Sequence, residues 1–147
     1  MFDHLRAFPQ QLRELIARVP PERLRMRLAD GTFAAVEQAW HLADLEVEGY
    51  GERIRRIEAE DEPELADFRG DVVAAERKYL ELELEPALVR FEEARARNVA
   101  ALESARDRSR AGHQEGVGRV TLARIAEMMA EHDAGHAAEL HALLQER

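Results

Sequence analysis

Apolar side chains recur at helical spacing in four segments of the chain, and no run of alternating β-branched residues indicates a strand. The pattern predicts helices over residues 9–18, 33–60, 71–106 and 121–145, separated by proline and glycine. Helices with one apolar face bury that face against each other. We therefore expect an all-α, antiparallel four-helix bundle that forms a single domain over residues 1–147.

Several local features should bound or interrupt these helices. Pro9 is expected in the first ordered turn of the first helix, and Pro86 should kink or break the third, because proline removes one helical hydrogen bond. Residues 104–119 hold three glycines and show no period, so we expect an unusually long loop, a feature that is often functional. The hydroxyl of Thr121 is expected to cap the last helix.

The last helix carries a histidine pair in the stretch EHDAGHAAEL, residues 131–140. On a helical wheel, His132, His136 and Glu139 interrupt the apolar stripe, while His141 lies half a turn away and faces solvent. Buried imidazoles are unfavourable unless each finds a partner, and one divalent ion can satisfy two histidines at i, i+4 spacing. Hydrogen bonding to a glutamate or to the backbone is the alternative, and the spacing alone leaves both open.

The stretch is similar to two known metal-binding motifs, but it matches neither of them fully. A zincin helix has glutamate as general base where this chain has the shorter Asp133, and it needs a further ligand well downstream of His136. A ferritin-like di-iron site needs Glu-x-x-His on two helices, which only Asp133-x-x-His136 approaches. A catalytic metal would need a third ligand from elsewhere in the chain.

His41 lies within the second predicted helix, in the sequence VEQAWHLADLEVE. The apolar stripe of that helix is centred about 140° away from it on the wheel, and acidic residues share its side. The pattern therefore predicts that His41 is exposed on an acidic face. The acidic residues of that face are Glu37, Asp44, Glu48 and Glu52.

Composition narrows the range of functions. The formal net charge is −9, and the basic residues are interleaved with Glu and Asp, which argues against nucleic acid as a partner. The chain has no apolar stretch long enough to span a membrane, and its start lacks a basic region followed by an apolar core, so we expect no membrane association and a cytoplasmic location. Because the chain has no cysteine, disulfides and thiolate ligands are excluded.

These motifs resemble the DinB/YfiT-like metal-binding superfamily. The resemblance runs from about Leu5 to Leu144. Its most specific part combines HLADLE at residues 41–46 with Thr-Leu at 121–122, followed by the His-x-x-x-His of the last helix.

The resemblance implies a four-helix bundle, often a homodimer, in which three histidines bind a divalent cation, commonly nickel or zinc. The ligand positions match His41, His132 and His136. Iron and manganese are further candidates for the cation. Characterised members of the family include thiol-S-transferases that use bacillithiol, mycothiol or glutathione, and a thiol-dependent maleylpyruvate isomerase.

The chain departs from the family pattern at three places. The sequence GTFA at residues 31–34 replaces the usual Gly-x-Trp-Ser, so Asp30 or Thr32 is expected to cap the second helix. Glu139 stands where glutamine is common, and a carboxylate there could orient a ligand or touch the metal. His113 precedes glutamine rather than proline, which leaves it a candidate for contact with substrate.

If the site is catalytic, the cation is expected to bind a low-molecular-weight thiol or water, lower its pKa and present it to an electrophile. One alternative is a non-catalytic dimer in which the ion joins the second and fourth helices. Another is a bundle whose site no longer binds metal. Candidates for an orienting residue or a general base are Glu37, Asp44, Glu139 and His113.

Overall fold

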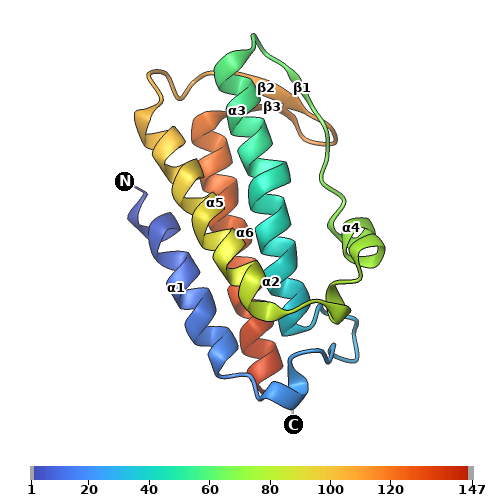
Figure 1. Ribbon diagram of the computed structural model, residues 1–147. Coiled ribbons are helices and arrows are strands. Elements are labelled where there is room, and N and C mark those ends of the chain that lie inside the picture. Colours follow the sequence, from blue (N-terminus) through green and yellow to red (C-terminus); the bar gives the residue numbers. More distant parts are fainter. Residues whose placement is uncertain (1, 146–147) are drawn as a thin grey trace.

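The computed structural model describes residues 2–145, which form four long helical rods packed side by side (Figure 1). The second rod is continuous through three elements, and a short helix, η1 (Pro21–Arg23), lies between the first two rods. The rods are α1 (Asp3–Ala17); α2 (Ala35–Asp44) with η2 (Leu45–Gly51) and α3 (Glu52–Ala59); α5 (Leu84–Ser104); and α6 (Leu122–Gln145). The four-helix bundle predicted from the sequence is confirmed.

The rods do not alternate in direction. In Figure 1, α1 and α6 run one way, whereas the α2–α3 rod and α5 run the other way. Trp40, early in its rod, donates a hydrogen bond to the carbonyl of Glu83 just before α5 (2.8 Å), and Asn98, late in α5, donates to the carbonyl of Glu46 (2.9 Å). The expected antiparallel order is therefore wrong for this pair, because residues 60–83 form a long connection that returns the chain to the same end.

A small sheet at one end of the bundle corrects the all-α prediction and the loop expected over residues 104–119 (Figure 1). Strands β2 (Ala111–Gln114) and β3 (Gly118–Thr121) form an antiparallel hairpin, and β1 (Glu64–Leu65) pairs in parallel with β2. The register of β1 places Glu64 opposite His113. These strands were not predicted because they are short, rich in glycine and held by pairing with a distant segment.

The first helix begins at Asp3 rather than near residue 9, so Pro9 lies in its interior. Proline at that position leaves the carbonyl of Leu5 without its helical donor. Arg95 of α5 replaces that donor, because its Nη1 donates to the Leu5 carbonyl at 3.0 Å. The hydrogen bond from Arg95 thus allows α1 to continue through Pro9, although proline favours a break in a helix.

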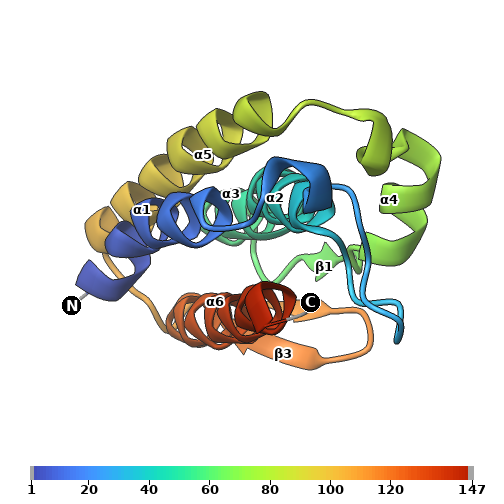
Figure 2. The ribbon, with the colours of Figure 1, turned by 90° about the horizontal axis from the view of Figure 1, so that it is seen from below.

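The third predicted helix is broken before Pro86, not kinked at it. Helix α4 (Gly70–Arg77) ends at Lys78, whose φ is 53°, and the turn η3 (Tyr79–Glu81) follows. Pro86 lies in the first turn of α5, where a missing N–H removes no helical hydrogen bond. Figure 2 shows that α4 stands outside the four rods, beside α2.

Helix starts are capped in one expected and one unexpected way. Thr121 caps α6 as predicted, because its Oγ1 accepts from the amide of Arg124 at 3.0 Å. Neither Asp30 nor Thr32 caps α2; instead the Glu37 carboxylate accepts from the amide of the N-cap residue, Ala34, at 3.0 Å.

The segment η2 is π-helical, and glycine permits its close packing. A Cβ at Gly51 would lie 2.9 Å from the carbonyl oxygen of Glu46. Wider π-helical turns rotate the following residues away from the α-helical period. Val47, inside this segment, is only partly buried, whereas Ile54 and Ile57, which follow it, are buried.

Two hydrophobic clusters fill the bundle, and polar residues lie between them along the rods. On α6, Leu122, Ile125 and Met129 belong to one cluster, and Leu140 and Leu143 belong to the other. On α5, Arg95 falls between Phe91 and Val99, which belong to different clusters. The chemistry-bearing residues of this protein are therefore held in a polar layer between two rigid apolar regions.

Within the described part of the chain, no helix combines the length and the apolar character that crossing a bilayer requires.

Candidate metal centre

Three histidines from two rods meet in the polar layer. His41 comes from α2, and His132 and His136 come from successive turns of α6. Each offers a ring nitrogen, and the three nitrogens lie within 4.8 Å of one another. The Nε2 atoms of His132 and His136 are 3.1 Å apart, and the His41 ring centroid lies 5.4 and 5.0 Å from those of His132 and His136. The three positions matched by the family resemblance thus form one group that could hold a metal ion.

Burial keeps these imidazoles neutral. It lowers the pKa of His132 to about 4 and that of His136 to about 3, with a further lowering by the neighbouring histidines. Burial also lowers the pKa of His41. A neutral imidazole has the lone pair that a cation needs, and the buried Nδ1 of His41 has no hydrogen-bond partner among residues 2–145. The donor set therefore fits a divalent cation.

The prediction that His41 is exposed on an acidic face is wrong. Its ring lies between those of Phe33 and Phe68, at centroid distances of 6.0 and 6.1 Å. A Cβ at Gly70, the first residue of α4, would lie only 2.5 Å from Cε1 of His41, so a larger residue here would displace the His41 ring. The connection between α3 and α5 covers this face of the helix, and helical periodicity contains no information about such a cover.

Asp44, one of the four catalytic candidates, is a buried structural carboxylate. It accepts hydrogen bonds from Nη1 of Arg77 (2.8 Å), the hydroxyl of Tyr79 (2.5 Å) and Nε of Arg90 (3.0 Å). These donors belong to α4, η3 and α5. Asp44 therefore attaches the covering segment to α2, and it is not one of the groups that meet at the histidines.

Two further candidates also lie outside the histidine group. Glu37 is 1% exposed and pairs with Arg27 through both oxygens, at 2.8 and 2.6 Å, in addition to capping α2. His113 is a partly exposed residue of β2, with its Nε2 3.3 Å from the carboxylate of Glu62. His141, chosen from the wheel as a solvent-facing comparison, is exposed as expected.

Glu139 approaches His136 directly, with its Oε2 3.5 Å from Nδ1, and is also linked to it through Gln38, a residue that the sequence did not single out. The side-chain amide of Gln38 donates from Nε2 to the Glu139 carboxylate (2.6 Å) and to the Phe33 carbonyl (3.2 Å). The Glu139 carboxylate and the Phe33 carbonyl can only accept hydrogen bonds, so they fix the NH₂ group of Gln38 on their side. Its Oε1 therefore faces Nδ1 of His136, with which it is in contact. The proton of His136 is then held on Nδ1, and its Nε2 lone pair faces His132. The only signal in the sequence was a polar residue one helical turn from the apolar residues Ala35 and Leu42.

Asp133, which lies between the two histidines of α6, binds Arg95. The guanidinium donates to both oxygens of Asp133 at 2.8 Å and to Glu46 at 3.0 Å, and Asn98 donates to the second Glu46 oxygen at 2.8 Å. All four side chains are buried. Asp133 is therefore engaged in the structure of the bundle, which agrees with the poor fit of the zincin motif.

The profile of the DinB superfamily matches residues 4–140, so the chain belongs to this superfamily. Among solved structures, the fold is similar to that of YfiT from Bacillus subtilis, described as a probable metal-dependent hydrolase with an unusual four-helix bundle topology. The TM-score is 0.88 at 19% sequence identity, and the match covers 97% of this chain and 82% of YfiT. No curated protein matches the sequence.

Proposed function

We propose that the protein is a metal-dependent enzyme whose divalent cation is bound by His41, His132 and His136. The observation that carries this proposal is the convergence of three neutral imidazoles, whose ring nitrogens lie within 4.8 Å of one another. A cation held by three neutral histidines keeps an open position, acts as a Lewis acid and lowers the pKa of a water or thiol that binds it. The description of YfiT as a probable metal-dependent hydrolase favours hydrolysis over thiol transfer.

The chain's own residues would prepare this site for catalysis. Gln38 keeps Nε2 of His136 free of a proton, and the rings of Phe33 and Phe68 shield His41 from water. The second oxygen of Glu139, Oε1, makes no hydrogen bond with the described residues, and the side chain is half exposed. Glu139 is therefore the carboxylate best placed to accept a proton from an attacking water or thiol.

Zinc or nickel is the cation we propose. Three imidazole nitrogens bind the later first-row metals more strongly than manganese, according to the Irving–Williams order. Since the chain has no cysteine, any thiol that takes part must come from a substrate or a cosubstrate.

Metal analysis of the purified protein tests the ligand assignment. We expect about one equivalent of zinc or nickel per chain in the wild type and its loss in His41→Ala, His132→Ala and His136→Ala. His141→Ala and His113→Ala are matched controls that should retain the metal, because neither residue belongs to the group. A wild-type protein that binds no divalent cation would refute the proposal.

Turnover separates an enzyme from a structural metal site. The metal-loaded protein would be assayed with a panel of esters and amides, and with low-molecular-weight thiols paired with a generic electrophile. Activity that disappears on chelation and returns with metal supports the enzyme. A lower melting temperature on chelation, without turnover on any substrate, would instead favour a metal that only joins α2 to α6.

We also propose that the protein forms a homodimer, as the family resemblance implies. Light scattering coupled to size-exclusion chromatography should give the mass of two chains, and the mass of one chain would contradict the proposal.

A further inference from the structure

Two arginines are buried among the described residues, and their surroundings differ sharply. Arg95, 2% exposed, donates to Asp133, Glu46 and the carbonyl of Leu5. Arg53, 5% exposed, makes no hydrogen bond and no ion pair with the described residues, and its Nε is fully buried without a partner. A guanidinium stays charged in proteins, and burying it unpaired is strongly unfavourable. An unpartnered buried arginine therefore indicates a missing anionic partner.

Tyr50 contacts both Arg53 and His132, one of the three histidines. The Cζ atom of Arg53 is 5.6 Å from the centroid of the Tyr50 ring, and that ring meets His132 edge to face at 6.2 Å. A tyrosine hydroxyl such as that of Tyr50 carries its proton at neutral pH. That hydroxyl likewise has no hydrogen-bond partner in the described part of the chain. Two unused donor groups, one of them charged, thus lie next to each other, and the Tyr50 ring adjoins the candidate ligand His132.

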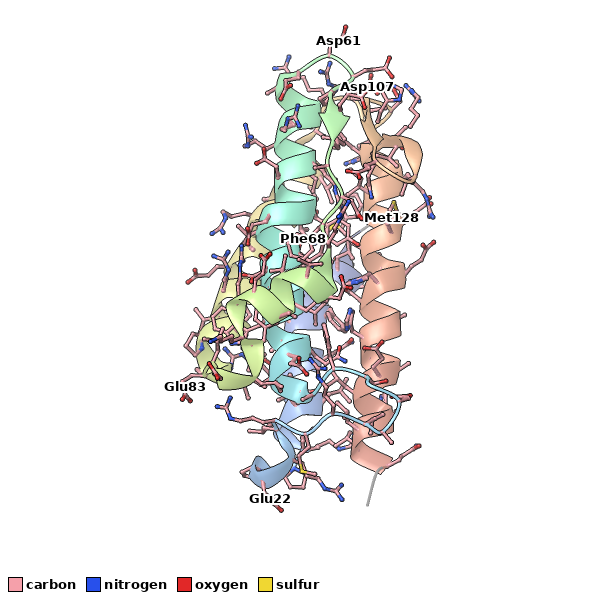
Figure 3. All side chains as sticks on the ribbon, turned by 90° about the vertical axis from the view of Figure 1, so that its right-hand side faces the viewer. Glu22, Asp61, Phe68, Glu83, Asp107 and Met128 are labelled. Atoms are coloured by element: carbon pink, nitrogen blue, oxygen red, sulfur yellow. The ribbon has the colours of Figure 1, made fainter. Side chains whose placement is uncertain are left out.

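No carboxylate of the described residues lies within ion-pair distance of Arg53. Glu46 and Asp133 are bound to Arg95, and the exposed carboxylate of Asp67, in the covering segment, attracts Arg53 only from beyond ion-pair distance. Figure 3 shows Phe68 of that segment and Met128 of α6 at similar heights on this face of the bundle. Phe68 also packs beside His41, so one covering segment borders both Arg53 and the histidines.

We infer that Arg53 and the hydroxyl of Tyr50 bind the carboxylate of a small organic anion whose reactive group lies at the three histidines. This inference rests on the proposed function, since it assigns the substrate class of that site. The planar guanidinium matches the two oxygens of a carboxylate, and the phenol supplies a further donor. One arginine and one neutral hydroxyl suit the single charge of a carboxylate better than the double charge of a phosphate.

Binding of two matched probes tests this site without requiring turnover. The probes are 3-mercaptopropionate and 3-mercaptopropanamide, which carry the same thiol and differ in the charged group. Titration calorimetry of the zinc-loaded protein should show the acid binding about 10- to 100-fold more tightly than the amide, as expected for hydrogen bonds to a charged group. Arg53→Gln should remove most of this preference while retaining zinc, and Tyr50→Phe should reduce it.

Arg55→Gln is the matched control, because it removes the same charge from an exposed position of α3, and the preference should be unchanged. A zinc-replete wild type without preference for the acid, or an Arg53→Gln variant that keeps it, would overturn the inference and leave the metal site standing. Zinc-free wild type would instead refute the proposed function. If Arg53→Gln does not fold, Arg53→Lys decides: a reduced preference supports the planar carboxylate site, and an unchanged one overturns it.

Discussion

Replacing Arg95 by methionine should destabilise the bundle severely, because Arg95 is the centre of its buried charge network. Its guanidinium supplies hydrogen bonds to Asp133, Glu46 and the carbonyl of Leu5, all at 2.8–3.0 Å. Methionine has a similar length and would remain against Phe91, whose ring centroid is 4.8 Å from Cζ of Arg95. The substitution therefore removes the charge and the donors while leaving little empty space.

The expected loss follows from the groups left behind. Removing one partner of a buried ion pair costs about 3–5 kcal/mol, because the other charge stays buried without compensation. The Leu5 carbonyl, which has no helical donor because of Pro9, would also lose its partner. A domain of this size has roughly 5–15 kcal/mol of stability, so the variant should be close to its folding limit. The melting temperature should fall by about 10 °C, at about 2–4 °C per kcal/mol.

Urea unfolding followed by circular dichroism at pH 7 measures this loss. Arg97→Met, an exposed substitution on the same helix, is the control and should change stability by no more than about 0.5 kcal/mol. The combination of Arg95→Met with Asp133→Asn and Glu46→Gln should recover much of the loss, because no buried charge remains unpaired. A loss below about 1 kcal/mol in Arg95→Met would refute the role of this network.

The dependence on pH gives a second readout of the same variant. Burial raises the pKa of the Asp133 carboxyl, and Arg95 works against that rise. Without Arg95 the pKa rises further, so the folded variant binds a proton at a higher pH than the unfolded chain does. Its stability relative to the wild type should therefore increase as the pH falls from 8 to 5. A constant difference over this range would contradict the explanation.

Three further predictions concern the metal centre. Gly70→Ala should displace His41 and weaken zinc binding about tenfold or more, as measured by competition with a chelator. Gly135→Ala is the control: a Cβ there meets open space, so the zinc affinity should be unchanged and the protein should gain about 0.5–1 kcal/mol of stability. Gln38→Leu should lower zinc affinity about 10- to 100-fold, because the proton of His136 is no longer held on Nδ1, and unchanged affinity would exclude that role. The metal-free protein should lose stability as the pH falls below about 6.5. At such a pH the histidines of the unfolded chain bind protons, whereas His132 and His136 stay neutral in the folded protein, where their pKa values are about 4 and 3. His136→Gln should reduce that slope, and a flat profile in the wild type would contradict the burial of both imidazoles.

Periodicity identified the four rods and the histidine pair of α6, because both depend on the repeat of a single helix. It placed His132 and His136 within a buried face and His141 in solvent; in the structure His136 is buried, His132 is partly buried and His141 is exposed. The cap of α6 by Thr121 is likewise a local interaction between residues three apart, and it was predicted correctly.

Contacts between distant segments decided the features that residue spacing within one helix cannot predict. His41 is covered because the distant segment 60–83 folds over an acidic face whose carboxylates are neutralised by arginines. The strand pairs form because β1 lies beside the hairpin, and Pro9 is tolerated because Arg95 donates to Leu5. Gln38 and Arg53 each looked like an ordinary polar residue in one helix. Only the packed bundle shows that Gln38 contacts His136 and Glu139, and that Arg53 has no hydrogen-bond partner among the described residues.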